Sequence, residues 1–294
     1  MIYINGIFSK NFSIKPLIVA KKLNVKTIIA PRGMLGAGAL AIKPIRKKIF
    51  LKTFNFFNLY KNVAWHATDQ TEKNEINHHI KNLSKVFIIP NMPVKPKLYI
   101  LDSKNKNENK LKLVYISRVS KKKNLNFILE ILYEEKFLKN IELDIWGPIE
   151  DETYFNLSKR LIAKINKESL NKVSYKGNLK WNEIESCLMN YDFFILPTLH
   201  ENFGHSIFES IAVGVPVLIS DNTPWSNLQR IKIGWDLNLN NRADWIKVLL
   251  YALKMKDEEY KLYAKNCINF ANNWLNNQNL MDKYSELFNL KNEA

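Results

Sequence analysis

The sequence predicts an α/β protein with two domains, each built from a parallel sheet and helices. Its 294 residues are enough for two domains. From residue 110 onward, short apolar runs alternate with longer amphipathic segments, which is the pattern of β-α-β units. The first 95 residues show the same alternation. The polar tract LDSKNKNENK, at 101–110, has the composition of a linker and separates the two halves.

The second half is expected to form one Rossmann-like domain. Five apolar runs predict its strands, at 111–119, 141–147, 172–177, 192–198 and 215–221. A helix is expected over DETYFNLSKRLIAKI, because acidic side chains favour the positive end of a helix dipole. The first half predicts about four strands, in MIYIN, VKTIIAP, VAWHAT and VFIIP, which is few for a self-standing doubly wound sheet. We assign residues 1–100 and 110–275 to the two domains.

The net charge of +16 suggests attraction to anions, which include nucleic acid, anionic lipid and phosphorylated substrates. The alternative is that solvated lysines simply reflect the residue usage of the chain. No apolar run approaches the ~20 residues of a membrane-spanning helix. The N-terminus lacks the pattern of a secretory signal, so a cytoplasmic location is the default expectation.

The stretch PTLHENFGHSIFES combines a strand end, a turn and a helix start. Glu201 falls in the turn and Glu209 on a helix that begins near Gly204 or His205. Ligands of open α/β sheets bind beyond the carboxyl ends of strands. Backbone amides around Phe203 would form a helix N-terminus, which favours a phosphate. The alternative is a capped helix with a solvated glutamate.

Two cations follow the strand LKLVYISRV at the same edge of the sheet. Arg118 and Lys123 are the groups that a diphosphate leaving group needs as negative charge builds on it. The neighbouring Lys121 and Lys122 are interpreted as a surface basic cluster. The whole arrangement suits a nucleotide sugar, with amides for the diphosphate, Glu201 for sugar hydroxyls and Glu209 for ribose hydroxyls.

Taken together, five motifs resemble glycosyltransferase family 4, whose members are retaining enzymes of the GT-B fold. They are YISRVSKKKN, DIWGP, VSYKGNL, YDFFILPTLHENFGHSIFESIAVGVPVLISDNTPW and GWDLN. The segments IIAPRGMLGAGALAIKPIRKKIFLKTF and WHATDQTE also resemble members that build bacterial surface polysaccharides such as lipopolysaccharide. The resemblance implies two Rossmann-like domains facing a cleft. It also implies retaining transfer of a sugar, of hexosyl type, from a nucleotide-diphosphate sugar to a glycan or lipid-linked acceptor.

The resemblance also implies roles for individual residues. Arg118 and Lys123 match the pair that holds the donor diphosphate, Glu209 the ribose-binding carboxylate, and Leu179 the position where backbone groups meet the nucleobase. The sugar and phosphate site corresponds to Glu201 with Asn202, Phe203, Gly204 and His205. No metal or other cofactor is expected, and the five histidines show no ligand grouping. Residues 276–294 correspond to the helix that the family folds back toward the N-terminal domain.

The N-terminal part departs from the family pattern. MIYINGIFSKNF resembles a strand reached well inside the usual domain, so we expect an incomplete N-terminal domain without the opening strand and glycine-rich loop. The alternative function is therefore a donor-binding subunit, or a remnant, that needs a partner chain for activity. Arg32 and Gly33 are expected on the acceptor side, whereas His66 is interpreted as structural. A sugar-nucleotide epimerase or a phosphorylase of the same architecture is a further rival.

The stretch KPIRKKIFLKTFNFFNLYKN is basic and aromatic. Such a helix can lie on an anionic membrane, which would place the protein at the inner face of that membrane. The alternative is a helix that packs its aromatic side chains into the N-terminal domain. No nucleic-acid-binding signature is present, so nucleic acid is not an expected partner.

Overall fold

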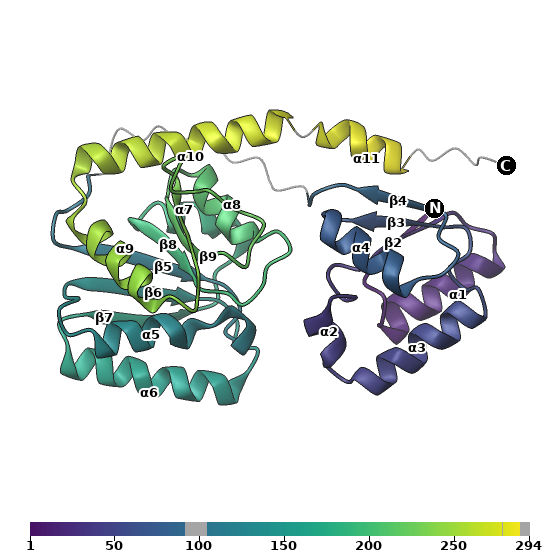
Figure 1. The fold of residues 1–294 in the computed structure, drawn as a ribbon, viewed down its shortest axis with the longest axis horizontal. Coiled ribbons are helices and arrows are strands. Elements are labelled where there is room, and N and C mark those ends of the chain that lie inside the picture. The colour runs from purple at the N-terminus through teal and green to yellow at the C-terminus, as the bar shows by residue number, and fades with distance from the viewer. Residues whose placement is uncertain (92–104, 278, 289–294) are drawn as a thin grey trace. The chain divides into compact units, whose positions relative to one another are not determined.

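The computed structural model describes residues 1–91, 105–277 and 279–288 (Figure 1). The chain divides into two compact units, residues 1–92 with 279–294 and residues 93–278. Each unit contains one parallel sheet, so the predicted α/β class is confirmed. We call them the N-terminal unit and the C-terminal unit.

The N-terminal unit has a four-stranded sheet in the order β1-β2-β3-β4. Its strands are β1 (Ile2–Asn5), β2 (Thr27–Ala30), β3 (Val63–Ala67) and β4 (Lys85–Ile88), which agrees with the predicted count. Its helices are α1 (Lys15–Lys22), α2 (Ala37–Ala41), α3 (Pro44–Phe56), α4 (Gln70–His79) and α11 (Leu280–Phe288).

The two faces of this sheet are covered from opposite ends of the sequence. Leu17 of α1, Phe54 of α3 and Ile76 of α4 share one core with Trp65 of β3. On the other face, the α11 side chain Tyr284 lies with its ring centroid 5.5 Å from that of His66, and Phe288 lies 5.8 Å from Tyr3. The C-terminal helix therefore belongs to the N-terminal unit.

The C-terminal unit has a six-stranded parallel sheet in the order β10-β9-β8-β5-β6-β7. The strands are β5 (Leu111–Ile116), β6 (Ile141–Trp146), β7 (Lys172–Gly177), β8 (Phe193–Leu196), β9 (Val217–Ser220) and β10 (Gly234–Leu237). The helices are α5 (Leu125–Glu134), α6 (Glu152–Glu168), α7 (Ile184–Leu188), α8 (His205–Ala212), α9 (Arg242–Lys254) and α10 (Asp257–Asn277). Five of the strands were expected. β10 was not, since GWDL is short and only partly apolar.

The helices of this unit form layers on both sides of its sheet (Figure 1). α5 and α6 lie on one side, where α9 joins α5 through a contact between Phe127 and Trp245 at 5.3 Å. α8 and α10 pack together on the other side, with Phe208 and Trp274 at 5.0 Å. Alternation of short apolar strands with amphipathic helices thus produces the doubly wound arrangement that the sequence predicts.

The expected linker needs a correction over 105–110, the part of it that the structure describes. The Lys106 side chain is buried, and its ammonium donates to the carbonyls of Asn107 and Lys110 at 3.2 Å each. Its backbone N–H donates to Asp257 at 2.8 Å. These residues are anchored to the C-terminal unit because backbone carbonyls and the Asp257 carboxylate in the first turn of α10 accept their hydrogen bonds. The composition of the segment does not reveal these partners.

Candidate functional site

Two loops meet at the carboxyl edge of the sheet in the C-terminal unit. β5 leads to Arg118 and a 3-10 turn at Lys121–Lys123, and β8 leads to Glu201. β5 and β8 are neighbours, with Leu113 opposite Phe193, so their carboxyl ends lie side by side. The Lys122 carbonyl accepts hydrogen bonds from the Thr198 hydroxyl at 3.1 Å and the Leu199 N–H at 2.8 Å. These bonds fix one loop against the other.

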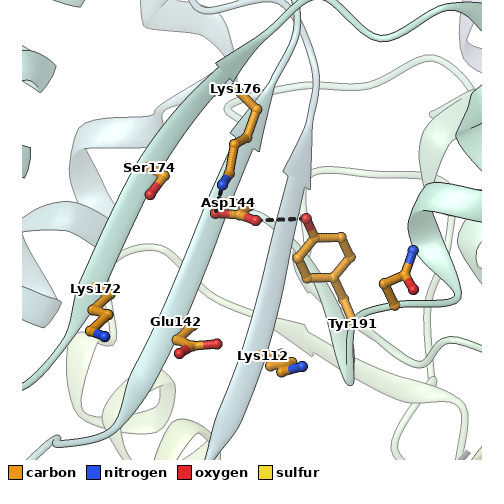
Figure 2. Close-up of a pocket in the computed structure, with 8 residues that line it drawn as sticks. Lys112, Glu142, Asp144, Lys172, Ser174, Lys176 and Tyr191 are labelled. Carbon is orange, nitrogen blue, oxygen red and sulfur yellow. Dashed lines mark hydrogen bonds and ion pairs between the residues drawn. The ribbon is translucent and has the colours of Figure 1, made fainter.

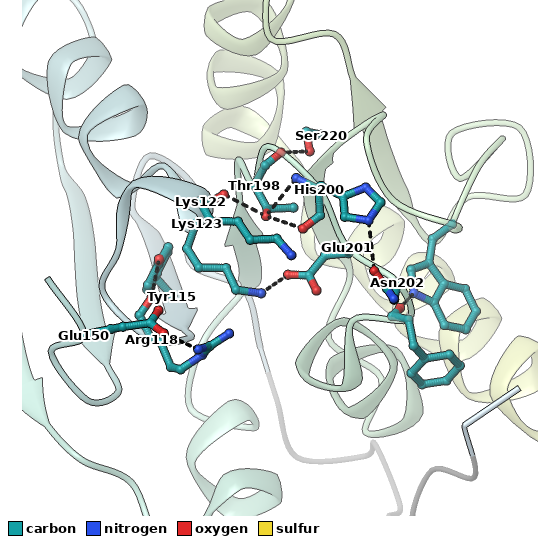
Figure 3. Close-up of polar contacts among 12 residues, drawn as sticks. Tyr115, Arg118, Lys122, Lys123, Glu150, Thr198, His200, Glu201, Asn202 and Ser220 are labelled. Carbon is teal, nitrogen blue, oxygen red and sulfur yellow. Dashed lines mark hydrogen bonds and ion pairs between the residues drawn. The ribbon is translucent and has the colours of Figure 1, made fainter. Parts of the chain in front are cut away.

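Lys123 and Glu201 form an ion pair across these loops (Figure 3). Each side chain is only 11% exposed. The Glu201 N–H also donates to the Asn222 carbonyl at 3.0 Å, which fixes the turn that carries the carboxylate. The structure thus brings together Lys123, expected from the sequence to hold the donor diphosphate, and Glu201, expected to bind the sugar. Because the pair is partly desolvated, its two charges interact more strongly than they would in water. Replacing either partner by a ligand group therefore changes the electrostatic energy of the site strongly.

Arg118 lies at the same edge but has a different partner. Its guanidinium pairs with Glu150, in the loop between β6 and α6 (Figure 3). The two side chains are 53% and 46% exposed. Glu150 could not be identified from the sequence, since nothing local in GPIED marks it as the partner of an arginine 32 residues earlier.

Helix α8 begins at His205, as predicted, and Gly204 makes this start sharp. Gly204 has φ +77°, a left-handed conformation that side chains disfavour. A Cβ at this position would lie 2.7 Å from Cδ1 of Ile207. The Ile207 and Phe208 N–H groups donate to the Gly204 carbonyl, which closes the first turn. A helix N-terminus of this kind favours an anion.

An aromatic cluster packs against the loop between β8 and α8. Phe203 is buried, and its ring lies 5.2 Å from Trp225 and 5.7 Å from Trp274 of α10. The Trp225 indole N–H donates to the Phe203 carbonyl. The Phe203 side chain therefore packs inward and its carbonyl is engaged, so a ligand could meet this residue only through its backbone N–H. Beside it, the Asn202 amide oxygen lies 2.9 Å from His200 Nε2.

Glu209 lies on α8, and no cation among the described residues pairs with it. Burial raises the pKa of its carboxyl above the ordinary value, and Glu185 raises it further. Within the described residues, no side chain donates a hydrogen bond to this carboxylate. Leu179 lies after β7, half-buried against the core of the unit. The structure thus leaves the Glu209 carboxyl group open to neutral hydroxyl donors.

In the N-terminal unit, Arg32 is held by a polar network. Its guanidinium donates to Asn5 at 3.0 Å, to the Tyr3 hydroxyl at 2.9 Å and to Asn91. The Gly33 N–H donates to Glu72 at 2.6 Å. The Arg32 charge is therefore engaged by neutral oxygen atoms at the carboxyl edge of the four-stranded sheet.

His66 belongs to the same network. It is fully buried, with Nδ1 2.6 Å from the Tyr3 hydroxyl and Nε2 2.7 Å from the Ile89 carbonyl. Burial lowers the pKa of His66 below its ordinary value, which favours the neutral ring. Both ring nitrogens are engaged, as the structural interpretation of this histidine requires.

A separate hollow of about 380 Å³ lies on the exposed face of β5, β6 and β7 (Figure 2). Asp144 within it already pairs with Lys176 at 3.5 Å and accepts from the Tyr191 hydroxyl at 2.7 Å. Lysines and carboxylates alternate along its wall, so we assign no ligand to it.

The described residues contain no group of three or more metal-ligating side chains. In the same ranges, no helix has the length and apolar character to cross a bilayer.

Comparison with known proteins shows the family. The profile of the glycosyl transferases group 1 matches residues 99–266, more than half of the chain. The chain belongs to this family. The match covers every C-terminal site residue described above, from Arg118 to Glu209.

Individual relatives agree with this assignment. The UDP-N-acetylglucosamine–peptide N-acetylglucosaminyltransferase GtfA subunit of Streptococcus pneumoniae is 27% identical over 123 residues, 42% of this chain and 23% of that protein. The chain spans less than half the length of the curated relatives it matches.

Solved structures show the fold. WaaG, a glycosyltransferase involved in lipopolysaccharide biosynthesis, superposes with a TM-score of 0.69 at 14% identity, over 97% of this chain and 85% of that one. Anabaena Alr3699/HepE, solved with UDP and glucose, gives 0.67 at 13% identity, over 94% and 75%. The fold of this glycosyl transferase is therefore of the GT-B type, with two Rossmann-like units.

Proposed function

We propose that this group 1 glycosyl transferase is a retaining family 4 enzyme. It moves a sugar, of hexosyl type, from a nucleotide-diphosphate sugar to a glycan or lipid-linked acceptor in surface polysaccharide biosynthesis. The Lys123–Glu201 pair beside the N-terminus of α8 carries this proposal. A cation and helix amides at this sheet edge match the donor diphosphate, on which negative charge builds as it leaves. A carboxylate at the same edge matches the sugar hydroxyls. HepE, solved with UDP and glucose, supports the choice of ligand.

In the proposed complex, Lys123 and Arg118 turn from Glu201 and Glu150 toward the donor diphosphate. Glu201 then accepts hydrogen bonds from sugar hydroxyls, and Glu209 accepts them from the ribose. The amides from Asn202 to His205 bind phosphate oxygens, while backbone groups at Leu179 meet the base. Arg32 and Gly33 serve the acceptor side. No metal or other cofactor is required, because the cations and helix amides supply the positive charge.

The reaction breaks the bond between the anomeric carbon and the diphosphate oxygen, and the bonding electrons leave with the diphosphate. The acceptor hydroxyl oxygen bonds to the same face of the anomeric carbon, which retains the configuration. Its proton passes to the departing phosphate, so no protein nucleophile is needed. Lys123 and Arg118 stabilise the charge that develops on the leaving group.

The first test is calorimetric binding of UDP, GDP and their sugar conjugates to the purified chain, with a chelator present. We expect one nucleotide to bind, and Glu209→Ala or Arg118→Ala to weaken that binding. Unchanged affinity in both variants would contradict the site assignment. Donor binding without transfer to any acceptor, relieved by an added partner chain, would identify a donor-binding subunit.

The exposed face of α3 supports contact with the cytoplasmic face of an anionic membrane. Ile45, Ile49 and Phe56 are 74%, 59% and 80% exposed, and helical spacing places them on one side with Lys48 and Lys52. By contrast, Phe50 and Phe54 pack inward, with ring centroids 4.1 Å apart. The segment 35–61 contains no Asp or Glu. Exposed apolar groups among lysines fit an anionic lipid surface.

Sedimentation with vesicles tests this contact. We expect binding to vesicles that contain anionic lipid, loss of binding with Ile45→Glu and Ile49→Glu together, and little binding to neutral vesicles. The matched control is Lys10→Glu, which changes charge elsewhere on the unit. Equal sedimentation of the double variant and the wild type would exclude this surface as the contact.

A further inference from the structure

Lys122 directly precedes Lys123 in the turn that follows β5, and its backbone is held in a fixed position. Its carbonyl accepts the hydrogen bonds from Thr198 and Leu199 that join the β5 and β8 loops. Its backbone is thereby held in place, while its side chain remains accessible. The side chain extends to the same side of the turn as that of Lys123, and its ammonium group interacts electrostatically with the Glu201 carboxylate (Figure 3). Lys122 therefore faces the candidate site rather than the opposite surface of the turn.

The charges around Lys122 do not balance. Lys123 pairs with Glu201, and Arg118 pairs with Glu150, so each pair is neutral. Within the described parts of the chain, the Lys122 ammonium has no ion-pair partner. It nevertheless interacts electrostatically with all four of these groups. Three cations thus face two carboxylates, and Lys122 supplies the positive charge that remains.

The surroundings make this charge costly to hold without an anion. Partial burial and the like charge of Lys123 lower the pKa of Lys122 below its ordinary value, although Glu201 and Glu150 oppose this shift. An anion bound beside these cations would favour the charged form of Lys122 and raise its pKa again. A lysine that merely extends into solvent, as expected from the sequence for Lys121 and Lys122, would not interact electrostatically with both pairs.

We propose that Lys122 is a third phosphate-binding cation of the donor site and sets its preference for nucleoside diphosphates over monophosphates. This inference rests on the proposed function, because it needs a donor diphosphate at this edge. Two paired cations suffice for one phosphate group after their carboxylates have been displaced. The second phosphate brings additional negative charge, which the unpaired ammonium can meet without breaking an ion pair.

The test compares Lys122→Ala and Lys122→Arg with Lys121→Ala, which removes the adjacent lysine of the same turn. Calorimetry measures the affinity of each protein for the nucleoside diphosphate that the wild type binds, the matching monophosphate and inorganic pyrophosphate. We expect Lys122→Ala to weaken diphosphate binding about tenfold or more, since a hydrogen bond to a charged group contributes ~1.5–3 kcal/mol. Monophosphate affinity should fall much less, and Lys122→Arg should restore most of the diphosphate affinity. Thermal melting checks that every variant is folded.

The possible outcomes separate the two ideas. If wild type binds the diphosphate but Lys122→Ala matches Lys121→Ala, the role of Lys122 is wrong and the proposed function stands. Equal losses for diphosphate and monophosphate would also overturn the preference. If the wild type binds pyrophosphate but neither nucleotide, and Lys122→Ala weakens that binding, the phosphate-binding role of Lys122 stands. The nucleotide donor of the proposed function is then wrong. If the wild type binds none of the three ligands, both proposals fail.

Discussion

The carboxyl edges of the two sheets both carry charged side chains, but those side chains are held differently. In the N-terminal unit, Arg32 donates to three neutral oxygen atoms, and the buried Glu72 accepts from backbone and hydroxyl groups. In the C-terminal unit, the cations Lys123 and Arg118 pair with carboxylates. A ligand that displaced Glu72 would break hydrogen bonds from backbone groups whose positions are fixed. A cation in an ion pair can instead exchange its carboxylate for the anion of a ligand. The same position in two similar folds therefore holds a cation by neutral oxygen atoms in one unit and by carboxylates that a ligand anion could replace in the other.

The largest effect is expected from Glu72→Ala. The Glu72 carboxylate is buried and accepts from the Gly33 N–H at 2.6 Å and from the N–H and hydroxyl of Thr68 at 2.7 Å each. Leaving these donors unsatisfied should cost about 3 kcal/mol of folding free energy in the N-terminal unit. Urea unfolding, followed by hydrogen exchange in each unit, measures the loss. Nucleotide affinity should not change.

The control for that variant is Glu75→Ala on the same helix. Burial, Glu72 and Asp69 raise the pKa of Glu75, so its charged form is disfavoured in the fold. Its removal should have little effect or increase stability slightly. Equal destabilisation by both variants would show that the Glu72 hydrogen bonds have no special importance.

Lys123→Ala tests the ion-paired edge of the C-terminal unit. It leaves the Glu201 carboxylate, 11% exposed, without its cation and removes a phosphate ligand. We expect nucleotide affinity to fall about 30-fold, which corresponds to ~2 kcal/mol. Arg32→Ala is the contrast, because it should lower sugar transfer while nucleotide affinity stays near the wild-type value. A loss of nucleotide affinity with Arg32→Ala alone would reverse the roles given to the two edges.

The pH dependence of nucleotide binding should report Glu209. Its pKa is raised by burial, so its carboxyl becomes protonated at a higher pH than an ordinary glutamate and then loses its capacity to accept ribose hydroxyls. Affinity should fall as the pH decreases through this raised pKa. Glu209→Gln should bind about tenfold more weakly at neutral pH, with a flatter pH profile. A profile identical to wild type would contradict the role of Glu209.

The same variant should change stability in the opposite direction. Because the folded-state pKa is raised, the folded protein holds its proton more tightly than the unfolded chain does, and stability decreases as the pH rises through this window. Replacing the carboxyl with a neutral amide removes this cost. Glu209→Gln should therefore melt at a higher temperature than wild type at neutral pH. A lower melting temperature would mean that the carboxylate stabilises the fold.

The smallest effect is expected from Glu150→Gln. The exposed pair with Arg118 contributes little to stability, but it must open before Arg118 can bind phosphate. Removing the competing charge should tighten nucleotide binding about twofold to fivefold, the range of an exposed ion pair. Calorimetry at low salt measures this change, and the exposed Glu152→Gln nearby is the control. Weaker binding in Glu150→Gln would mean that Glu150 positions Arg118 for the ligand.

Much of the fold followed from local sequence patterns. Apolar runs located nine of the ten described strands, and Asp151 caps α6 by accepting from the Tyr154 N–H at 2.9 Å. The start of α8 was predicted because Gly204 follows a strand and a turn. β10 was missed, since its pairing with β9 determines the strand more than its own short sequence does.

The charged partners were less accessible to sequence reasoning. Arg118, Lys123 and Glu201 were identified as site residues, but Glu150 was overlooked and Lys122 was interpreted as a surface lysine. An ion pair depends on which loops meet in space, and the two partners are separated by 32 residues in one pair and 78 in the other. Similarly, the basic aromatic stretch gave no indication of which aromatic side chains would be buried.

The sequence by itself determined the alternation of strands and helices, the two-unit α/β class and the residue types at the carboxyl edge of the second sheet. These features depend on periodicity and on residues close in the chain. Only the tertiary structure decided which charges neutralise one another, which side of α3 stays exposed, and that α11 covers the second face of the first sheet. Those outcomes require segments distant in sequence to meet, and the free energy of their contacts depends on burial and distance that no single segment contains.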